Sequence, residues 1–173
     1  MNISILEKFK ILLKESALII ITLNYFFIKR IIKRELTLKL KKSLLDIGCG
    51  TGILAPLFPK DCYLGIDLDK KLIAFAKDQH TDYSFQVMNA NSLTFPKETF
   101  DQILIVGVIH HLDPTIALVA MKQLKKVLKK DGRILLIEAI PPIKSFNLLG
   151  KLLRLFDEGH HIRPMNDYKE LFS

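Results

Sequence analysis

The sequence has little cysteine and no apolar run long enough to cross a bilayer. Its two cysteines, Cys49 and Cys62, lie in a glycine loop and a predicted strand, so neither belongs to a disulfide framework. This usage favours a reducing cytoplasm. The longest uncharged run within residues 1–42, from Ser16 to Ile28, is shorter than the ~20 residues that a membrane-spanning helix needs. It also lacks the small-residue cleavage site of a signal peptide.

Charge is distributed unevenly along the chain. Residues 1–42 carry 10 Lys/Arg and 3 Asp/Glu, a net charge of +7, whereas residues 43–173 carry 16 and 15 and are nearly neutral. A length of 173 residues with 49% hydrophobic residues suits one globular domain, which we place at 43–173. The neutral domain argues against a nucleic-acid partner, and the basic arm, 1–42, favours an anionic surface such as a membrane.

A glycine loop follows the first predicted strand. The short apolar run 43–47 is typical of a buried parallel strand. Gly48, Gly50 and Gly52 come next, and glycine permits left-handed backbone and the close approach of a ligand. A helix is expected after the loop, with its free N–H groups directed at the ligand. The pattern predicts a nucleotide-type site at the carboxyl end of the first strand of a doubly wound sheet.

The run from Asp46 to Gly52, D-I-G-C-G-T-G, resembles the first motif of class I S-adenosylmethionine-dependent methyltransferases. A dinucleotide-binding fold has the spacing G-x-G-x-x-G, but Ile53 stands here where its third glycine would be. The resemblance implies that S-adenosylmethionine is the cofactor. It also implies that Asp46 orients the amino-acid end of the cofactor and that the loop binds it through Gly48, Cys49, Gly50 and Gly52.

Two further strands are predicted to supply cofactor contacts. Residues 62–67 form the second predicted strand and end in Asp67, an acid placed to accept hydrogen bonds from both ribose hydroxyls. Leu68 lies beside it. Asp69 fits better as the cap of a helix over 70–79, whose predicted inner face is Leu72, Phe75 and Ala76. Residues 83–88 predict the third strand, followed by Asn89 and Ala90. The resemblance implies that these two contact adenine; the alternative is that Asn89 only makes the turn.

The fourth predicted strand, 100–107, ends in Gly107, which we include among the cofactor-binding residues. In similar methyltransferases the sequence H-H-L that follows lies near the transferred methyl group. His110 or His111 is therefore the candidate to take a proton from the acceptor or to align it with the sulfur. The alternative is that both rings hydrogen-bond locally and shape the wall of the site.

In the last part of the chain, helices and strands are predicted to alternate as before. Asp113-Pro114 begins a helix with a buried stripe that ends in Leu128, and Asp131-Gly132 stops it. A strand over 133–138, a helix over 145–156, a polar loop over 157–164 and a helix capped by Asn166 follow. His160, His161 and Arg163 in the loop are candidates to face an anionic acceptor. Adjacent histidines rarely bind one ion together, so no metal site is predicted.

The predicted fold class is α/β, a Rossmann-like doubly wound, mostly parallel sheet with helices on both faces. The family's sheet has seven strands, and the five counted here lack the last two. Three explanations stay open: a truncated or frameshifted gene product, a fragment, or a partner chain that completes the sheet, as in a homo-oligomer. An edge left without a partner is one that natural proteins usually protect.

The implied function is methyl transfer from S-adenosylmethionine to a small-molecule or lipid-linked acceptor. One alternative is a non-catalytic remnant that keeps the cofactor loop. Another is a nicotinamide-dependent oxidoreductase, which the glycine spacing disfavours. The basic arm also has two interpretations. Residues 16–42 form either a helix in a membrane interface, with a cytoplasmic domain attached, or a helix packed on the sheet or over the cofactor.

Overall fold

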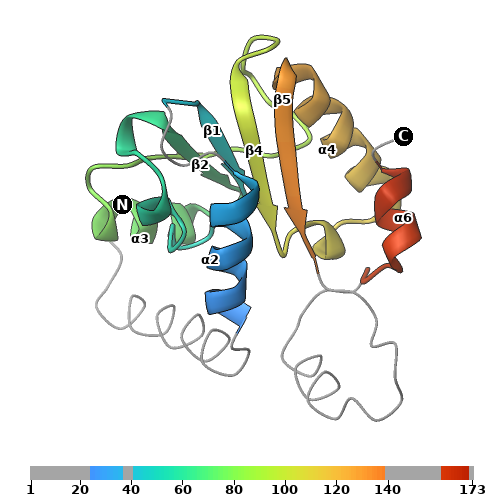
Figure 1. Cartoon of the computed structure of the whole chain (residues 1–173), viewed down its shortest axis with the longest axis horizontal. Helices are drawn as coiled ribbons and strands as arrows, with labels where there is room; N and C mark the ends of the chain where they lie inside the picture. The colour runs from blue at the N-terminus through green and yellow to red at the C-terminus, as the bar shows by residue number, and fades with distance from the viewer. Residues whose placement is uncertain (1–23, 37–40, 139–160, 172–173) are drawn as a thin grey trace.

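The computed structural model describes residues 24–36, 41–138 and 161–171, and these contain one sheet of five parallel strands (Figure 1). The spatial order is β3-β2-β1-β4-β5, so the order reverses between β1 and β4. The predicted Rossmann-like α/β fold is confirmed. The strands are β1 (Leu44–Ile47), β2 (Tyr63–Asp67), β3 (Ser84–Val87), β4 (Phe100–Val106) and β5 (Leu128–Ile137).

Helices cover both faces of this sheet, because side chains along a strand alternate between its faces. Leu45, Ile47 and Ile103 point to one core, under α4 (Pro114–Val127) and α6 (Met165–Glu170). Leu44 and Leu104 point to the other core, under α2 (Asn24–Glu35) and α3 (Lys70–Gln79). The strands are therefore buried from two sides, as their apolar runs predicted.

Both predicted aspartate caps are present. Asp69 accepts the backbone N–H groups of Lys71 and Leu72 at the start of α3. Asp113 accepts the N–H of Thr115 at the start of α4, where Pro114 occupies the first turn. The inner face of α3 differs slightly from the prediction, because Ile73 is buried with Phe75 and Ala76 while Leu72 is only partly buried.

The end of α4 was predicted wrongly. The helix ends at Val127, and Leu128 already belongs to β5, opposite Phe100. The reason lies in the segment before β4: Glu98 N–H donates to the carbonyl of Lys126 at 3.1 Å, and Thr99 N–H donates to that of Val127 at 2.8 Å. These bonds satisfy carbonyls that a longer helix would have used itself.

No α-helix follows the glycine loop, contrary to the prediction. Two short 3-10 helices stand between β1 and β2: η1 (Ala55–Leu57) and η2 (Lys60–Cys62). Pro56 and Pro59 cannot donate backbone hydrogen bonds, so an α-helix through this segment would lack two of them. The segment after the loop therefore directs no α-helix dipole at it.

The C-terminal segment also differs from its prediction. Helix α6 begins at Met165 after Pro164, with no side chain capping it, so Asn166 lies inside the helix. The residue at the N-cap position is Pro164, whose side chain has no oxygen that could accept a backbone N–H. The predicted helix over 145–156 and His160 lie outside the described residues.

Helix α2 packs on the sheet beside β5 (Figure 1). Ile32 is fully buried, Leu36 is 3% exposed, and both belong to the second core. The Arg133 guanidinium of β5 donates to the carbonyl of Glu35 at 2.9 Å. Of the two interpretations of the arm, packing on the domain holds for residues 24–36. Among the helices that the structure describes, none has the length and the apolar character that crossing a bilayer requires.

We expect Ile32→Ala to lower the free energy of unfolding by about 2–5 kcal/mol, because it leaves a cavity under α2. Phe27→Ala, on the exposed side of the same helix, should change it by no more than about 0.5 kcal/mol. Urea denaturation of both variants measures the difference. Equal, small effects would show that α2 does not contribute to the core.

Candidate functional site

The site begins at the loop after β1. Gly48, Gly50 and Gly52 have φ values of +65°, +54° and +75°, in the left-handed region. A Cβ on Gly48 would lie 2.4 Å from Cγ2 of Val108, and one on Gly52 would lie 2.7 Å from the ring of Phe85. Both distances are far below van der Waals contact. The loop therefore needs glycine for its conformation and for the space around it.

Asp67, the predicted ribose acid, lies at the end of β2 against this loop. Its Oδ2 accepts the N–H of Gly50 at 3.0 Å, and its Oδ1 accepts the N–H of Asp69 at 2.8 Å. Because Asp69 is the cap of α3, Asp67 is not the cap of this helix. The side chain of Leu68 follows it and is 68% exposed. The sheet thus brings the acid, an exposed apolar side chain and the glycine loop together.

Asn89 and Ala90 follow β3, the strand next to β2. The side-chain oxygen of Asn89 accepts the N–H of Asn91 at 2.9 Å, which is the turn-forming contact that the sequence left as an alternative. Ala90 packs partly buried against the first core. Within the described residues, Oδ1 of Asn91 is a buried acceptor with no hydrogen-bond partner. Such an orphan acceptor fits an edge where a ligand supplies donors.

The loop after β4 faces the glycine loop from the other side. Gly107 has a φ of +65°, and the 3-10 helix η3 (Ile109–His111) follows. The two candidate histidines differ, because His110 is 5% exposed and His111 is exposed. Their ring centroids are 4.1 Å apart. The ring of His110 lies over Gly107, where an added Cβ would be 3.6 Å from its Cε1.

Sequence reasoning missed Glu138, the residue that follows β5. Its Oε1 accepts the N–H groups of Val108 at 2.8 Å and Ile109 at 2.6 Å. Its Oε2 lies 2.5 Å from Nδ1 of His110, and both side chains are buried. The signal was available, since the predicted strand 133–138 ends in an acid, the same pattern that identified Asp67 at the end of 62–67.

Arg163 does not have the predicted role toward an anionic acceptor. It is 8% exposed, and its guanidinium donates to three backbone carbonyls, those of Ile109 at 2.8 Å, Leu112 at 2.6 Å and His161 at 3.1 Å. A guanidinium has donors in a fixed fork, and here they join two segments of the chain. Arg163 therefore anchors the C-terminal segment to the loop after β4.

Asp46 is buried within β1. Its Oδ2 accepts a hydrogen bond from the hydroxyl of Tyr63 at 2.6 Å. Burial raises the pKa of Asp46 to about 7, although the bond from Tyr63 acts against this shift. Burial also raises the pKa of the Cys49 thiol, and the carboxylates of Asp46 and Asp67 add to that. A raised pKa disfavours the reactive thiolate form of Cys49, and the backbone N–H of this residue donates to the carbonyl of Ile66.

These residues meet at the carboxyl ends of β1, β2, β3 and β4, around the point where the strand order reverses. Open parallel sheets bind their ligands at such a point. The glycine loop, Asp67 at the end of β2 and the unpartnered Oδ1 of Asn91 after β3 together fit a nucleoside-bearing cofactor. In the part of the chain that the structure describes, no three His, Cys, Asp or Glu side chains gather as a metal site would need.

Residues 45–136 match the family described as methyltransferase domain, and this match covers more than half of the chain. The chain belongs to the class I S-adenosylmethionine-dependent methyltransferase family. The uncharacterised methyltransferase YcgJ of Bacillus subtilis is 30% identical over 141 residues, 75% of this chain and 54% of that protein. The crystal structure of YcgJ superposes with a TM-score of 0.64 at 28% identity, over 82% of this chain and 64% of the other.

Two other relatives of this chain are named for their acceptors. The demethylmenaquinone methyltransferase of Thermotoga maritima is 27% identical over 66% of this chain and 50% of its own length. The fatty-acid O-methyltransferase of Mycolicibacterium smegmatis is 32% identical over 58% of this chain and 38% of its own length. The chain thus spans about half the length of the curated relatives it matches, or less.

We expect the Asp46→Asn variant to become more stable than the native sequence as pH rises. Asp46 keeps its proton in the folded state up to about pH 7, whereas the unfolded state loses it near pH 4. The folded state binds more protons in this window, so the native protein loses stability with rising pH. Between pH 4.5 and 7.5 the stability difference between the two should change by about 3 kcal/mol.

Urea denaturation at several pH values measures this difference. Asp61→Asn is the matched control, because Asp61 lies in η2 on an exposed surface. Its stability should keep a constant offset from the native protein. Parallel curves for Asp46→Asn and the native protein would show that Asp46 ionises normally in the fold.

Proposed function

We propose that this chain binds S-adenosylmethionine at the carboxyl edge of its sheet and methylates a small-molecule or lipid-linked acceptor. The observation that carries the proposal is the 3.0 Å bond from Gly50 N–H to Asp67, because it joins the glycine loop to the acid after β2. The family to which the chain belongs supports the cofactor. When bound, the cofactor supplies an activated methyl group on its sulfonium.

Each element contributes one part of the cofactor site. Gly48, Gly50 and Gly52 let the loop backbone approach the cofactor, and Asp67 accepts hydrogen bonds from the ribose hydroxyls. Leu68 and the turn at Asn89-Ala90 line the adenine. The remaining residues assigned to the site are Asp46 in β1, Cys49 in the glycine loop and Gly107 directly after β4.

His110 is the better candidate of the two histidines for contact with the acceptor. Its ring is buried and its Nδ1 is fixed by Glu138, whereas His111 is exposed. A general base must be held within hydrogen-bond reach of the proton that it takes. The second hypothesis is a cofactor-binding remnant, which would bind the cofactor at the same site but transfer no methyl group.

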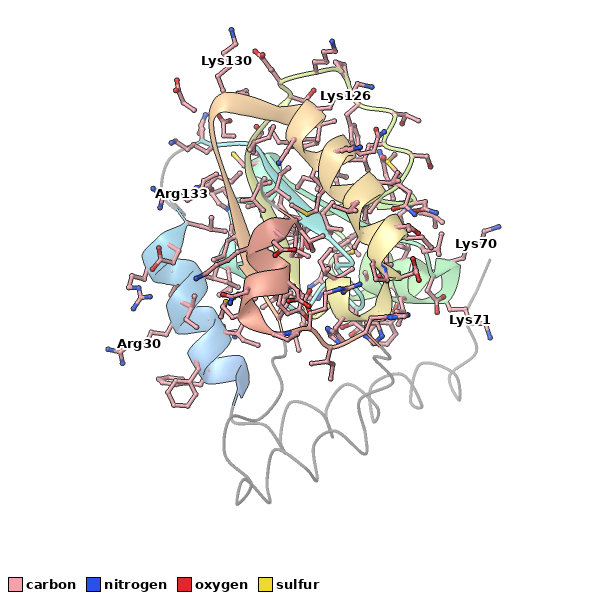
Figure 2. The ribbon with its side chains drawn as sticks, turned by 90° about the vertical axis from the view of Figure 1, so that its right-hand side faces the viewer. Arg30, Lys70, Lys71, Lys126, Lys130 and Arg133 are labelled. Carbon is pink, nitrogen blue, oxygen red and sulfur yellow. The ribbon has the colours of Figure 1, made fainter. Side chains whose placement is uncertain are left out.

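A lipid-linked acceptor is supported by the outer face of α2. Phe26 is 65% and Phe27 56% exposed, and Arg30, Lys33 and Arg34 lie exposed on the same side of the helix. Figure 2 shows Arg30 pointing away from the ribbon. The N-terminal end of α2 lies toward the carboxyl ends of β4 and β5 (Figure 1). Exposed aromatic rings beside basic side chains are typical of contact with an anionic membrane.

Titration calorimetry with S-adenosylhomocysteine tests the cofactor. We expect the chain to bind it and Asp67→Ala to weaken binding at least about tenfold, because two charge-assisted hydrogen bonds are lost. Asp61→Ala, on an exposed surface before β2, should bind like the native chain. A folded native chain that does not bind would exclude the proposed enzyme and the remnant alike.

Sedimentation with lipid vesicles tests the membrane surface. The chain should sediment with vesicles of phosphatidylcholine and phosphatidylserine, and Arg30→Gln should weaken binding about fivefold, because one basic residue contributes about 1 kcal/mol. The double variant Phe26→Ala/Phe27→Ala should weaken it further. The control is Leu118→Ala/Val119→Ala, an apolar pair on α4 whose side chains are each 45% exposed. Equal losses in both double variants would count against the α2 surface.

A further inference from the structure

Glu138 makes three short contacts, and both of its carboxylate oxygens contact the loop after β4. Oε1 accepts the two consecutive N–H groups of Val108 and Ile109, and Oε2 meets Nδ1 of His110. The Glu138 side chain is 3% exposed. A carboxylate buried this deeply is costly unless it is paired, so these contacts hold it in one place.

The same loop is also fixed from the side of the C-terminal segment. Arg163 donates to the carbonyls of Ile109 and Leu112, and the N–H of His161 donates to the carbonyl of His110 at 2.9 Å. The loop backbone is therefore held through its N–H groups by Glu138 and through its carbonyls by Arg163 and His161. With the backbone held on both sides, the His110 ring is the part of the loop that Oε2 orients.

We propose that Glu138 is a positioning residue that fixes the tautomer of His110. A carboxylate can only accept, so the proton of the neutral ring sits on Nδ1 and the lone pair on Nε2. The inference rests on the proposed function, in which Nε2 takes the proton that leaves the acceptor. The ring then becomes an imidazolium, and the adjacent Glu138 carboxylate stabilises its charge without taking the proton.

Glu138→Gln makes a sharp test because a glutamine has one accepting oxygen. The two backbone N–H groups need an acceptor at the Oε1 position, so the amide oxygen should occupy it. The amide NH2 then faces the ring and donates to Nδ1. We expect the His110 tautomer to invert, with the proton moving to Nε2, while the fold is retained.

Histidine-labelled protein, studied by nitrogen-15 NMR without ligands, reports the protonation of each ring nitrogen. His110→Asn assigns the signal by its loss. We expect the native protein to carry the proton on Nδ1 and Glu138→Gln to carry it on Nε2. The His80 signal should stay unchanged in both, and Glu170→Gln, an exposed acid of α6, should leave His110 as in the native protein.

A native His110 that is protonated on Nε2, or on both nitrogens, at neutral pH would overturn the proposal. So would an unchanged tautomer in a folded Glu138→Gln. If Glu138→Gln unfolds, Glu138→Asp provides the second variant, and its shorter side chain should weaken the preference for Nδ1–H. Calorimetry with S-adenosylhomocysteine on the same proteins separates the two proposals, because tautomer inversion without cofactor binding would keep the positioning role and reject the proposed function.

Discussion

The site depends on the close approach of two loops, one after β1 and one after β4. At position 48 there is room for a hydrogen but not for a methyl group, since a Cβ would lie 2.4 Å from Val108. The two strands are neighbours, and the sheet order reverses between them. The loops therefore leave their strands side by side. Their contact sets how near the glycine backbone lies to the His110 loop, and so how near a bound cofactor would lie to a bound acceptor.

Three carboxylates near this edge differ because their surroundings differ. Asp46 is buried against one hydroxyl, and its pKa is raised to about 7. Asp67 meets the backbone of the glycine loop and is only partly buried. Glu138 is buried but accepts two backbone N–H groups beside a histidine ring. The same functional group is thus buried in a core, held beside the glycine loop, or paired with a histidine ring, according to the donors that the fold provides.

Helix α2 joins two properties that the sequence presented as alternatives. Its inner side, with Ile32 and Leu36, belongs to the core of the domain. Its outer side carries exposed phenylalanines and basic residues, the pattern of a membrane-facing surface. A helix has enough circumference for both, because residues three and four apart share a face and the opposite face remains. A packed helix of this kind would hold the domain in a fixed orientation to a surface.

The sequence by itself determined the five strands, the aspartate caps and the glycine loop, because apolar runs, capping side chains and left-handed glycines act over a few neighbouring residues. Tertiary structure decided the rest. Helix α4 ends at Val127 because residues 98–99 donate to its last carbonyls. Arg163 turns inward because distant carbonyls face it. Glu138 meets His110 because β4 and β5 pair in parallel register. These partners are far apart in sequence, and local patterns do not encode which distant groups the sheet will bring together.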